Sequence, residues 1–232
     1  MVLGMILKTF NQFIRIDSRF NVDDILLMCS KMDDFFSNPL VVLKDDSTST
    51  VILSELNGQK YVIKRANTKN IAHIFKRALK TSRAQKNWDN ARRLNKIGIP
   101  AIQAIAMMEE RWGIFKGRSY FVCPYIDGVD ARQFFARDAQ PNTTWATVAQ
   151  NICTMIQTLA QHKLSHRDLN LSNIILVSNV PYLIDLDAMT HYKIPWVASW
   201  AAKKEQRRFM QNWQNDPKPH NSAAKLFQAL LS

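Results

Sequence analysis

The alternation of apolar and polar residues in the first half of the chain predicts β-structure. Two β-rich runs, residues 51–55 and 60–64, flank the sequence Leu56-Asn57-Gly58-Gln59. Because Asn-Gly tolerates the positive φ angles of a tight turn, these runs are predicted to form a hairpin. A third apolar run, residues 120–123, predicts a buried strand, and the turn-forming residues 124–128 after it predict a hinge between two lobes.

Helical spacing dominates two other regions. Residues 71–95 are rich in Ala, Lys, Arg and Gln and stop before Gly98, which predicts one long helix or two consecutive ones. From Asn142, apolar residues follow at intervals of three and four, and this second helix leads the chain to His166. Its predicted buried positions are Trp145, Val148, Ile152, Ile156 and Leu159. Beyond it, residues 174–177 and 182–184 are predicted strands separated by a turn at 178–181.

The order of these elements predicts the fold class. A chain of 232 residues is long enough for one domain of two lobes. We expect an α+β fold of two lobes: a small β-rich N-lobe with a long helix at about 1–122, a hinge at about 123–128, and a larger, mostly helical C-lobe at about 129–232.

Composition narrows the cellular context. The formal net charge of +12 predicts either an anionic partner or a solvated basic surface. No basic run is interleaved with aromatic residues, so a nucleic-acid partner is not expected. The three cysteines lack the number and spacing of a disulfide framework or a zinc site, which favours a reducing compartment.

The termini and apolar runs bear on localisation. Residues 1–6 are apolar, but the segment is too short for a signal peptide and has no basic residue before Lys8. No run approaches the roughly 18 uncharged apolar residues that a spanning helix needs. We therefore expect a cytoplasmic protein whose membrane association, if any, is peripheral.

The most specific motif begins at His166. The sequence His166-Arg167-Asp168-Leu169-Asn170-Leu171-Ser172-Asn173 matches the H-R-D-L-x-x-x-N catalytic loop of protein kinases at every defined position. In that chemistry, Asp168 accepts or orients the proton of the attacking hydroxyl, and Asn173 holds a phosphate-bound metal ion. His166 and Arg167 complete the predicted catalytic group. The alternative is a helix-to-strand connection whose Asp and Asn form only turn hydrogen bonds.

A second carboxylate follows seventeen residues later. Asp185 ends the apolar run 182–184, where a kinase carries the metal-binding Asp of D-F-G, and Asp187 stands in place of the glycine. Mg²⁺ prefers such oxygen ligands and neutralises the phosphate oxygens during transfer. Asp185 is the expected ligand because it directly follows the strand. For Asp187, direct metal binding and a supporting or solvated carboxylate remain equally open.

The predicted nucleotide contacts lie upstream. The run Tyr61-Val62-Ile63-Lys64 is similar to V-A-I-K, whose lysine reaches the α- and β-phosphates. The turn at 44–50 contains no glycine where kinases carry a glycine-rich loop. Its Ser47, Thr48 and Ser49 could still cradle phosphate, provided that Asp45 and Asp46 point away. In the predicted hinge, Tyr125 is the remaining candidate for nucleotide binding.

Together these segments resemble the bacterial lipopolysaccharide core kinases of the Kdo/WaaP family. The resemblance covers roughly residues 43–213 and implies an α+β, bilobal protein-kinase-like fold. It rests on the catalytic loop, on Leu183-Ile184-Asp185-Leu186-Asp187, and on three further segments. Those segments are the helix with Ser82-Arg83-Ala84, Trp88, Asn90-Ala91 and Leu94; the turn Gly98-Ile99-Pro100; and the helix Arg207-Arg208-Phe209-Met210-Gln211-Asn212-Trp213.

The resemblance implies a function. Such enzymes use ATP and Mg²⁺ to phosphorylate a sugar hydroxyl, on Kdo or heptose, of the lipopolysaccharide inner core at the cytoplasmic face of the inner membrane. Expected partners are thus a Kdo- or heptose-bearing lipid A precursor and an anionic membrane surface held by electrostatics. Candidate membrane contacts are Lys76, Arg77, Lys80, Arg83, Lys203, Lys204, Arg207 and Arg208. The Asp-Leu-Asp sequence resembles the D-F-D form of Kdo kinases and slightly favours Kdo.

Two departures keep other functions open. Asn87 stands where many kinase-like proteins carry the helix glutamate that pairs with the strand lysine, and Asp89 lies two residues away. The glycine-free loop favours a non-catalytic pseudokinase, although the retention of Lys64, Asp168, Asn173 and Asp185 argues against one. A protein kinase or a small-molecule kinase is the other alternative, but no A-P-E motif follows Asp187, which disfavours a regulated protein kinase.

Overall fold

The computed structural model describes residues 4–67, 80–137, 143–213 and 221–231. Within these residues the chain forms two compact units. The first, here the sheet unit, comprises the described residues up to Arg93 together with Gln103–Tyr125. The second, here the helical unit, comprises Leu94–Ile102 and the described residues from Ile126 onward.

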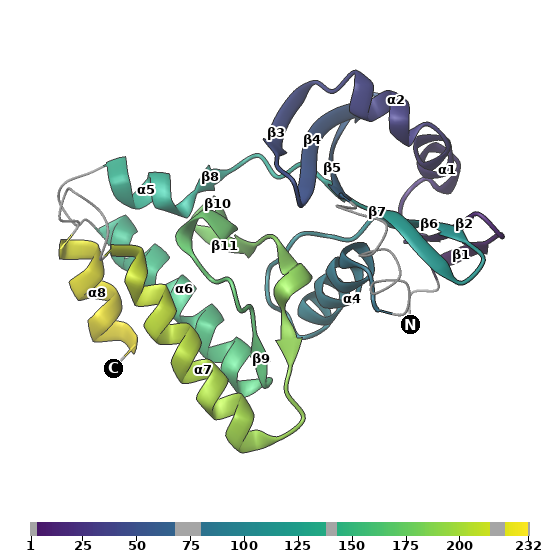
Figure 1. Ribbon diagram of the computed structural model, residues 1–232. Coiled ribbons are helices and arrows are strands. Elements are labelled where there is room, and N and C mark those ends of the chain that lie inside the picture. Colours follow the sequence, from purple (N-terminus) through teal and green to yellow (C-terminus); the bar gives the residue numbers. More distant parts are fainter. Residues whose placement is uncertain (1–3, 68–79, 138–142, 214–220, 232) are drawn as a thin grey trace. The chain divides into compact units, whose positions relative to one another are not determined.

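In the sheet unit the described strands form one antiparallel sheet of order β1-β2-β6-β7-β5-β4-β3, drawn in Figure 1. Its elements are β1 (Met5–Lys8), β2 (Gln12–Ile16), α1 (Val22–Ser30), α2 (Met32–Ser37), β3 (Val41–Asp45), β4 (Ser49–Leu56), β5 (Gln59–Ala66), most of α4 (Arg83–Lys96), β6 (Ala106–Trp112) and β7 (Phe115–Pro124).

The short helices α1 and α2 cover one face of this sheet (Figure 1). Their buried side chains pack against apolar residues that alternate along the central strands, which is why the strands show a period of two. The core contains Ile25, Met28 and Met32 from the helices and Ile14, Ile52, Ile63, Met108 and Val122 from the strands. Asn21 caps α1 by accepting hydrogen bonds from the N–H groups of Asp23 and Asp24.

The predicted Asn-Gly hairpin is confirmed. Asn57 and Gly58 have φ angles of 51° and 75°, and Leu56 pairs with Gln59 across the turn. The two strands are longer than predicted, because pairing continues to Ser49 and Ala66. The predicted strand at 120–123 is likewise part of the longer β7.

The helical unit combines four helices with short strands. Its elements are the end of α4, then β8 (Val129–Asp130), α5 (Ala131–Arg137), α6 (Thr143–Gln161), β9 (Leu164–Ser165), the 3₁₀ turn η1 (Leu171–Asn173), β10 (Ile174–Val177), β11 (Val180–Leu183), η2 (Leu186–Ala188), β12 (Thr190–His191), α7 (Pro195–Met210), η3 (Gln211–Trp213) and α8 (Asn221–Leu231). The described strands form two small sheets, β11-β10-β8 and β12-β9.

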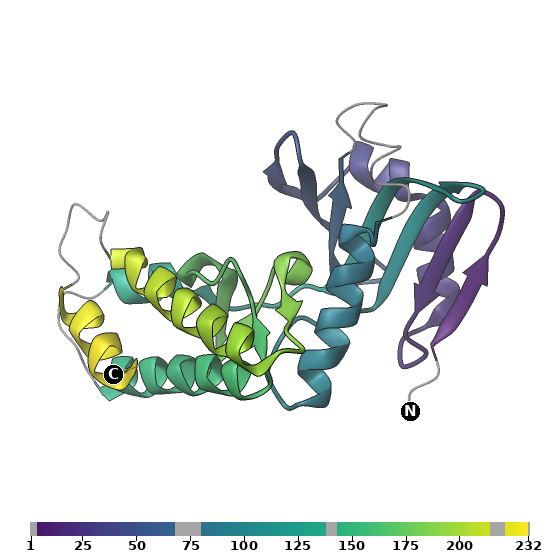
Figure 2. The ribbon, with the colours of Figure 1, turned by 60° about the horizontal axis from the view of Figure 1, so that its bottom comes forward.

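Helices α6, α7 and α8 lie side by side (Figure 2). All five apolar positions predicted for α6 are buried. Edge-to-face ring contacts join Phe135 of α5, Trp145 of α6, Phe209 of α7 and Phe227 of α8. Through this aromatic cluster the four helices pack against one another.

Two predicted boundaries differ. Residues 178–181 were expected to form a turn, but only Ser178 and Asn179 do, with φ angles of 48° and 67°, so Pro181 lies in β11 and Ile184 beyond it. Within the predicted helix at 71–95, residues 80–82 are described but not helical, and α4 starts at Arg83; residues 68–79 and Asn142 lie outside the described residues. α4 ends as expected, since Gly98 has a φ of 76° and Ile99 N–H bonds to Leu94 O.

Candidate active site

His166 anchors the start of the predicted catalytic loop. It directly follows β9, is fully buried, and its Nε2 lies 2.9 Å from the carbonyl oxygen of Ile184. Burial lowers the pKa of His166, so the imidazole is neutral and donates its Nε2 proton to that carbonyl. The side chain is therefore a structural link within the motif.

Asp168 is exposed beyond this anchor, and Asn173 turns back toward it. The Nδ2 of Asn173 donates to the carbonyl oxygen of Asp168 at 2.8 Å and lies 3.4 Å from its Oδ2. Asn170 donates to the same carbonyl oxygen at 3.1 Å. These bonds curl the loop through η1 and bring the two motif residues together, as their spacing predicts.

Ile184 joins the loop to the second carboxylate motif. Its N–H donates to the carbonyl oxygen of Asn173 at 3.0 Å, while its own carbonyl accepts from His166. The next residue, Asp185, adopts the left-handed conformation with φ 57° and ψ 60°. The structure thus brings Asp168, Asn173 and Asp185 into one hydrogen-bonded assembly, with Asp187 buried in the adjoining η2.

The side chains present fit a hard cation. Asn173 and Asp185 supply an amide and a carboxylate oxygen from neighbouring backbone segments, which are ligands that Mg²⁺ prefers. In the described part of the chain, no group of three or more His, Cys, Asp or Glu side chains could hold a metal ion.

Lys64 lies in the sheet unit, on β5, paired with Val51 of β4 and Phe121 of β7. Asn87 of α4 occupies the position where many kinase-like proteins carry the glutamate that pairs with the strand lysine. It is buried, and its Nδ2 donates to the carbonyl oxygen of Arg83 at 3.2 Å. Asp89 forms an ion pair with Arg15 of β2, 3.6 Å away. Asp89 therefore helps to attach α4 to the sheet.

The predicted phosphate loop is closed by its own carboxylate. Asp46 Oδ1 accepts hydrogen bonds from the N–H of Thr48 at 2.6 Å, its hydroxyl at 2.6 Å and the N–H of Ser49 at 2.8 Å. These bonds hold the pKa of Asp46 well below its usual range. The donors that were expected to meet phosphate are engaged by Asp46, which does not point away from the loop.

Tyr125 is the last residue of the sheet unit and directly follows β7. Its N–H donates to the carbonyl oxygen of Lys60 at 3.0 Å, and its side chain is exposed.

The three cysteines are buried and free, and burial raises the pKa of each thiol to about 12, so none is a reactive thiolate.

Sequence analysis missed Glu205. This residue interrupts the buried stripe of α7, otherwise formed by Ala198, Ala201 and Phe209, and its Oε1 accepts the N–H of Arg167 at 2.6 Å. A charged residue at a core-facing helical position was the available signal.

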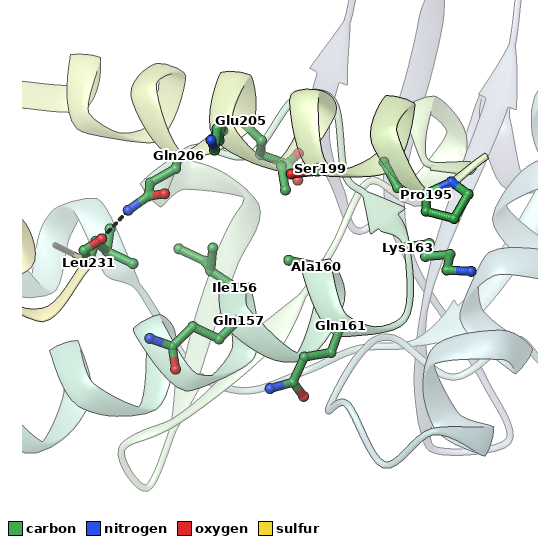
Figure 3. Close-up of a pocket in the computed structure, with 13 residues that line it drawn as sticks. Ile156, Gln157, Ala160, Gln161, Lys163, Pro195, Ser199, Glu205, Gln206 and Leu231 are labelled. Atoms are coloured by element: carbon green, nitrogen blue, oxygen red, sulfur yellow. Dashed lines mark hydrogen bonds between the residues drawn. The ribbon is translucent and has the colours of Figure 1, made fainter. Parts of the chain in front are cut away.

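A groove of about 400 Å³ runs between α6 and α7 and reaches the end of α8 (Figure 3). Ala160 and Ile156 of α6 form one side, Ser199 and Gln206 of α7 the other. The residues that line it include Glu205 but none of the predicted site residues.

A family model described as the lipopolysaccharide kinase (Kdo/WaaP) family matches residues 45–215. The chain belongs to this family. A comparison with curated protein sequences gives no significant match. As a member of the Kdo/WaaP family, the protein is a kinase of the lipopolysaccharide core, and its resemblance to that family is confirmed.

Two solved structures similar to this chain are a WaaP complex and a bacterial kinase domain. One similar structure is "WaaP in complex with acyl carrier protein", with a TM-score of 0.53 and 17% identity, covering 86% of this chain and 87% of that one. Another is the PknI kinase domain of Mycobacterium tuberculosis, with a TM-score of 0.45 and 18% identity over 74% of this chain and 69% of that one. The likeness to the WaaP structure and the family match confirm the α+β, protein-kinase-like fold predicted for this Kdo/WaaP kinase.

Proposed function

We propose that the protein transfers the γ-phosphate of ATP to a sugar hydroxyl, on Kdo or heptose, of the lipopolysaccharide inner core. The observation that carries the proposal is the assembly of Asp168, Asn173 and Asp185 through the backbone of Ile184. A turn that merely connected two elements would have no need to gather two carboxylates and an amide.

The chemistry is an in-line displacement. The sugar hydroxyl oxygen attacks the γ-phosphorus, the bond from phosphorus to the β,γ-bridging oxygen breaks, and ADP leaves. The hydroxyl proton passes to the exposed carboxylate of Asp168, whose backbone is fixed by Asn170 and Asn173. Lys64 is assigned to the α- and β-phosphates by its place in the V-A-I-K-like strand.

Asn173 and Asp185 would hold Mg²⁺, with Asp187 a further candidate. The bound ion supplies charge neutralisation at the β- and γ-phosphate oxygens. For Ser47, Thr48 and Ser49, phosphate binding would first require Asp46 to release the loop N–H groups. Tyr125, at the end of β7, is kept as a candidate nucleotide contact.

The outer face of α7 supports peripheral attachment to an anionic membrane. Trp196 and Trp200 are 74% and 57% exposed, and they share this face with Lys203, Lys204 and Arg207 at helical spacing. Lys204 Nζ lies 5.1 Å from the ring centroid of Trp200. Tryptophan beside lysine and arginine suits the headgroup layer of an anionic bilayer. No described helix is both long and apolar enough to cross a membrane.

On this proposal the protein acts at the cytoplasmic face of the inner membrane, where its acceptor is anchored. The α7 outer face could alternatively receive a protein partner, as the structure titled "WaaP in complex with acyl carrier protein" raises for a similar fold. The exposed tryptophans favour the bilayer, because their rings gain most at the boundary between water and hydrocarbon.

In the deciding experiment, the purified protein is incubated with labelled ATP, Mg²⁺ and one of several acceptors. We expect transfer to a Kdo- or heptose-bearing lipid A precursor, with a slight preference for Kdo, and little transfer to protein or to small alcohols. Transfer to protein alone would overturn the acceptor class. ATP binding without transfer to any acceptor would favour a pseudokinase.

A further inference from the structure

Two exposed arginines lie beside the catalytic carboxylate. Arg167 directly precedes Asp168, and the Nη1 of Arg208 in α7 donates a hydrogen bond to the carbonyl oxygen of Arg167. Both arginines are exposed. That carbonyl belongs to the peptide group that joins Arg167 to Asp168, so the Arg208 guanidinium lies at the backbone of the catalytic residue. All three residues belong to the helical unit.

The protein leaves most of the hydrogen-bonding capacity of these two guanidinium groups unused. A guanidinium carries several N–H donors. Within the described residues, Arg208 directs one of them to the Arg167 carbonyl and forms no other hydrogen bond or ion pair. The Arg167 guanidinium forms none with the described part of the chain. The pair therefore presents unused donors and two positive charges next to Asp168.

A short connection follows the second carboxylate motif. Only residues 189–194 separate η2 from α7, and two of them form β12, which pairs with β9. In regulated protein kinases, arginines bind a phosphorylated residue of the activation loop. This connection is too short to be such a loop, so the anion that Arg167 can bind is one that a ligand brings.

α7 links the arginine pair to the tryptophans that we assign to the membrane. Trp196, Trp200, Lys204 and Arg208 are spaced by four residues, so each side chain neighbours the next along the helix. Lys204 Nζ lies 5.1 Å from the ring centroid of Trp200. At about 1.5 Å per residue, the helix from Trp196 to Arg208 is about 18 Å long. A headgroup that projects from a bilayer at the tryptophans would pass Lys204 and reach Arg208.

The proposed reaction gives such cations a purpose. An acceptor must come close to the carboxylates of Asp168 and Asp185 and to the phosphates of ATP, all of which are negatively charged. Like charges at contact distance oppose the binding of an anionic acceptor. Arginine offsets this repulsion, and its planar group binds a carboxylate or a phosphate through two parallel N–H bonds.

We propose that Arg167 and Arg208 form an anion site that binds a carboxylate or a phosphate ester of the acceptor beside the hydroxyl that Asp168 activates. The inference rests on the proposed transfer to a lipopolysaccharide acceptor and names the group by which that acceptor is recognised. Kdo is a sugar acid and lipid A carries phosphate esters, so both sources are present. Loss of either arginine should raise KM for the acceptor more than it lowers kcat.

The test uses a deacylated, water-soluble form of the Kdo-bearing lipid A precursor, so that membrane attachment does not contribute. Three versions are compared: the unmodified compound, its carboxyl methyl ester, and the compound without the lipid A phosphates. Calorimetry without ATP measures binding, and transfer of labelled phosphate gives KM and kcat.

The variants are Arg167→Gln, Arg167→Lys, Arg208→Gln and Arg208→Lys, each checked by thermal unfolding. The matched control is Arg207→Gln, which removes the neighbouring charge of α7, whose Nε bonds to the Lys203 carbonyl. If Arg167→Gln fails to fold, the Arg208 variants decide, since that side chain is exposed. A purely structural role of Arg208 would lower kcat for all three versions alike.

We expect the wild-type protein to bind the unmodified compound about 10- to 100-fold more tightly than the version that lacks the recognised anion. Weaker binding of the methyl ester identifies a carboxylate, and weaker binding of the phosphate-free compound identifies a phosphate. The glutamine variants should lose most of this preference, the lysine variants should keep part of it, and Arg207→Gln should keep it. No preference in the wild-type protein, an unchanged preference in either glutamine variant, or an equal loss in Arg207→Gln would overturn the proposal.

The binding measurement separates the anion site from the proposed function. If both arginines carry the preference but no phosphate is transferred, the proposed function fails and the anion site stands. If phosphate is transferred with equal KM for all three versions, the anion site fails and the proposed function stands.

Discussion

The imidazole of His166 and the carbonyl oxygen of Ile184 lie 2.9 Å apart and join the start of the catalytic loop to the residue before Asp185. Because burial lowers the pKa of His166, the folded state favours the neutral ring. Stability from this group is present above the unfolded pKa of about 6.5 and is lost as pH falls toward the folded value.

We therefore expect His166→Gln, which keeps an N–H donor but does not titrate, to remove part of the loss in stability between pH 7 and 5. Urea unfolding of both proteins at several pH values measures the difference. If the wild-type protein and the variant lose free energy of unfolding in parallel, His166 is not the titrating group.

The contribution of Glu205 to stability depends on pH with the opposite sign. Burial raises its folded pKa to about 6, above the usual value of 4.5, so its contribution to stability is fully present below pH 4.5 and is lost as pH rises through 6. The shift corresponds to about 2 kcal/mol. Glu205→Gln should consequently make the acid-side loss of stability steeper than in the wild-type protein. The same unfolding series tests this, and a shallower slope would contradict the raised pKa.

Asp168→Asn should abolish phosphoryl transfer while leaving the fold and nucleotide binding nearly intact. The side chain is exposed, and the Asn173 bond is mainly to the backbone carbonyl, which the variant retains. Removing a general base costs typically about 10²- to 10⁴-fold in rate. Turnover, nucleotide affinity and thermal unfolding should be measured together, with the exposed Asp23→Asn as control. Wild-type turnover would exclude Asp168 as the catalytic carboxylate.

Asp46→Asn should lower KM for ATP several-fold. The variant keeps an oxygen that can accept the N–H groups of Thr48 and Ser49 but removes a negative charge from the predicted phosphate loop. Asp45→Asn removes the charge of the adjacent residue, whose carboxylate accepts a hydrogen bond from the Thr50 hydroxyl at 2.8 Å, and should have the smaller effect. If both variants keep the wild-type KM for ATP, ATP does not approach this loop.

Trp196→Ala and Trp200→Ala should weaken binding to vesicles of anionic lipid, because each removes an exposed ring from the α7 outer face. Lys203→Ala and Lys204→Ala should weaken it at low salt only, since surface charges are screened within about 8 Å at physiological ionic strength. Co-sedimentation with vesicles at two salt concentrations separates the two contributions. Trp112→Ala, at the end of β6 and 70% exposed, is the matched control; if it alone reduces binding, another surface meets the membrane.

The amino-acid sequence predicted the elements whose signals are local. The Asn57-Gly58 turn, the buried stripe of α6 and the end of α4 at Gly98 follow from backbone freedom and helical period. The eight-residue motif from His166 to Asn173 predicted a shared role, and the structure brings its Asp and Asn together. The predicted protein-kinase-like fold rests on the same motifs.

The sequence analysis made no prediction for β1, β2, α1 or α2. These segments are too short to show a clear strand period of two or helix period of 3.6 residues. These elements are stable through the core that they share with β4, β5, β6 and β7. Their place in the sheet is decided by burial against distant strands, which no local pattern reports.

At the site the same limit applies. Spacing named Asp168, but only the tertiary structure decided that Glu205 holds the catalytic loop from α7. The turn that Asp46 closes is local, because its partners Thr48 and Ser49 lie two and three residues along the chain. Glu205 and Arg167 are 38 residues apart. A buried carboxylate must find hydrogen-bond donors when the chain folds, and which peptide groups supply them depends on how whole elements pack, not on the residues beside it in the sequence.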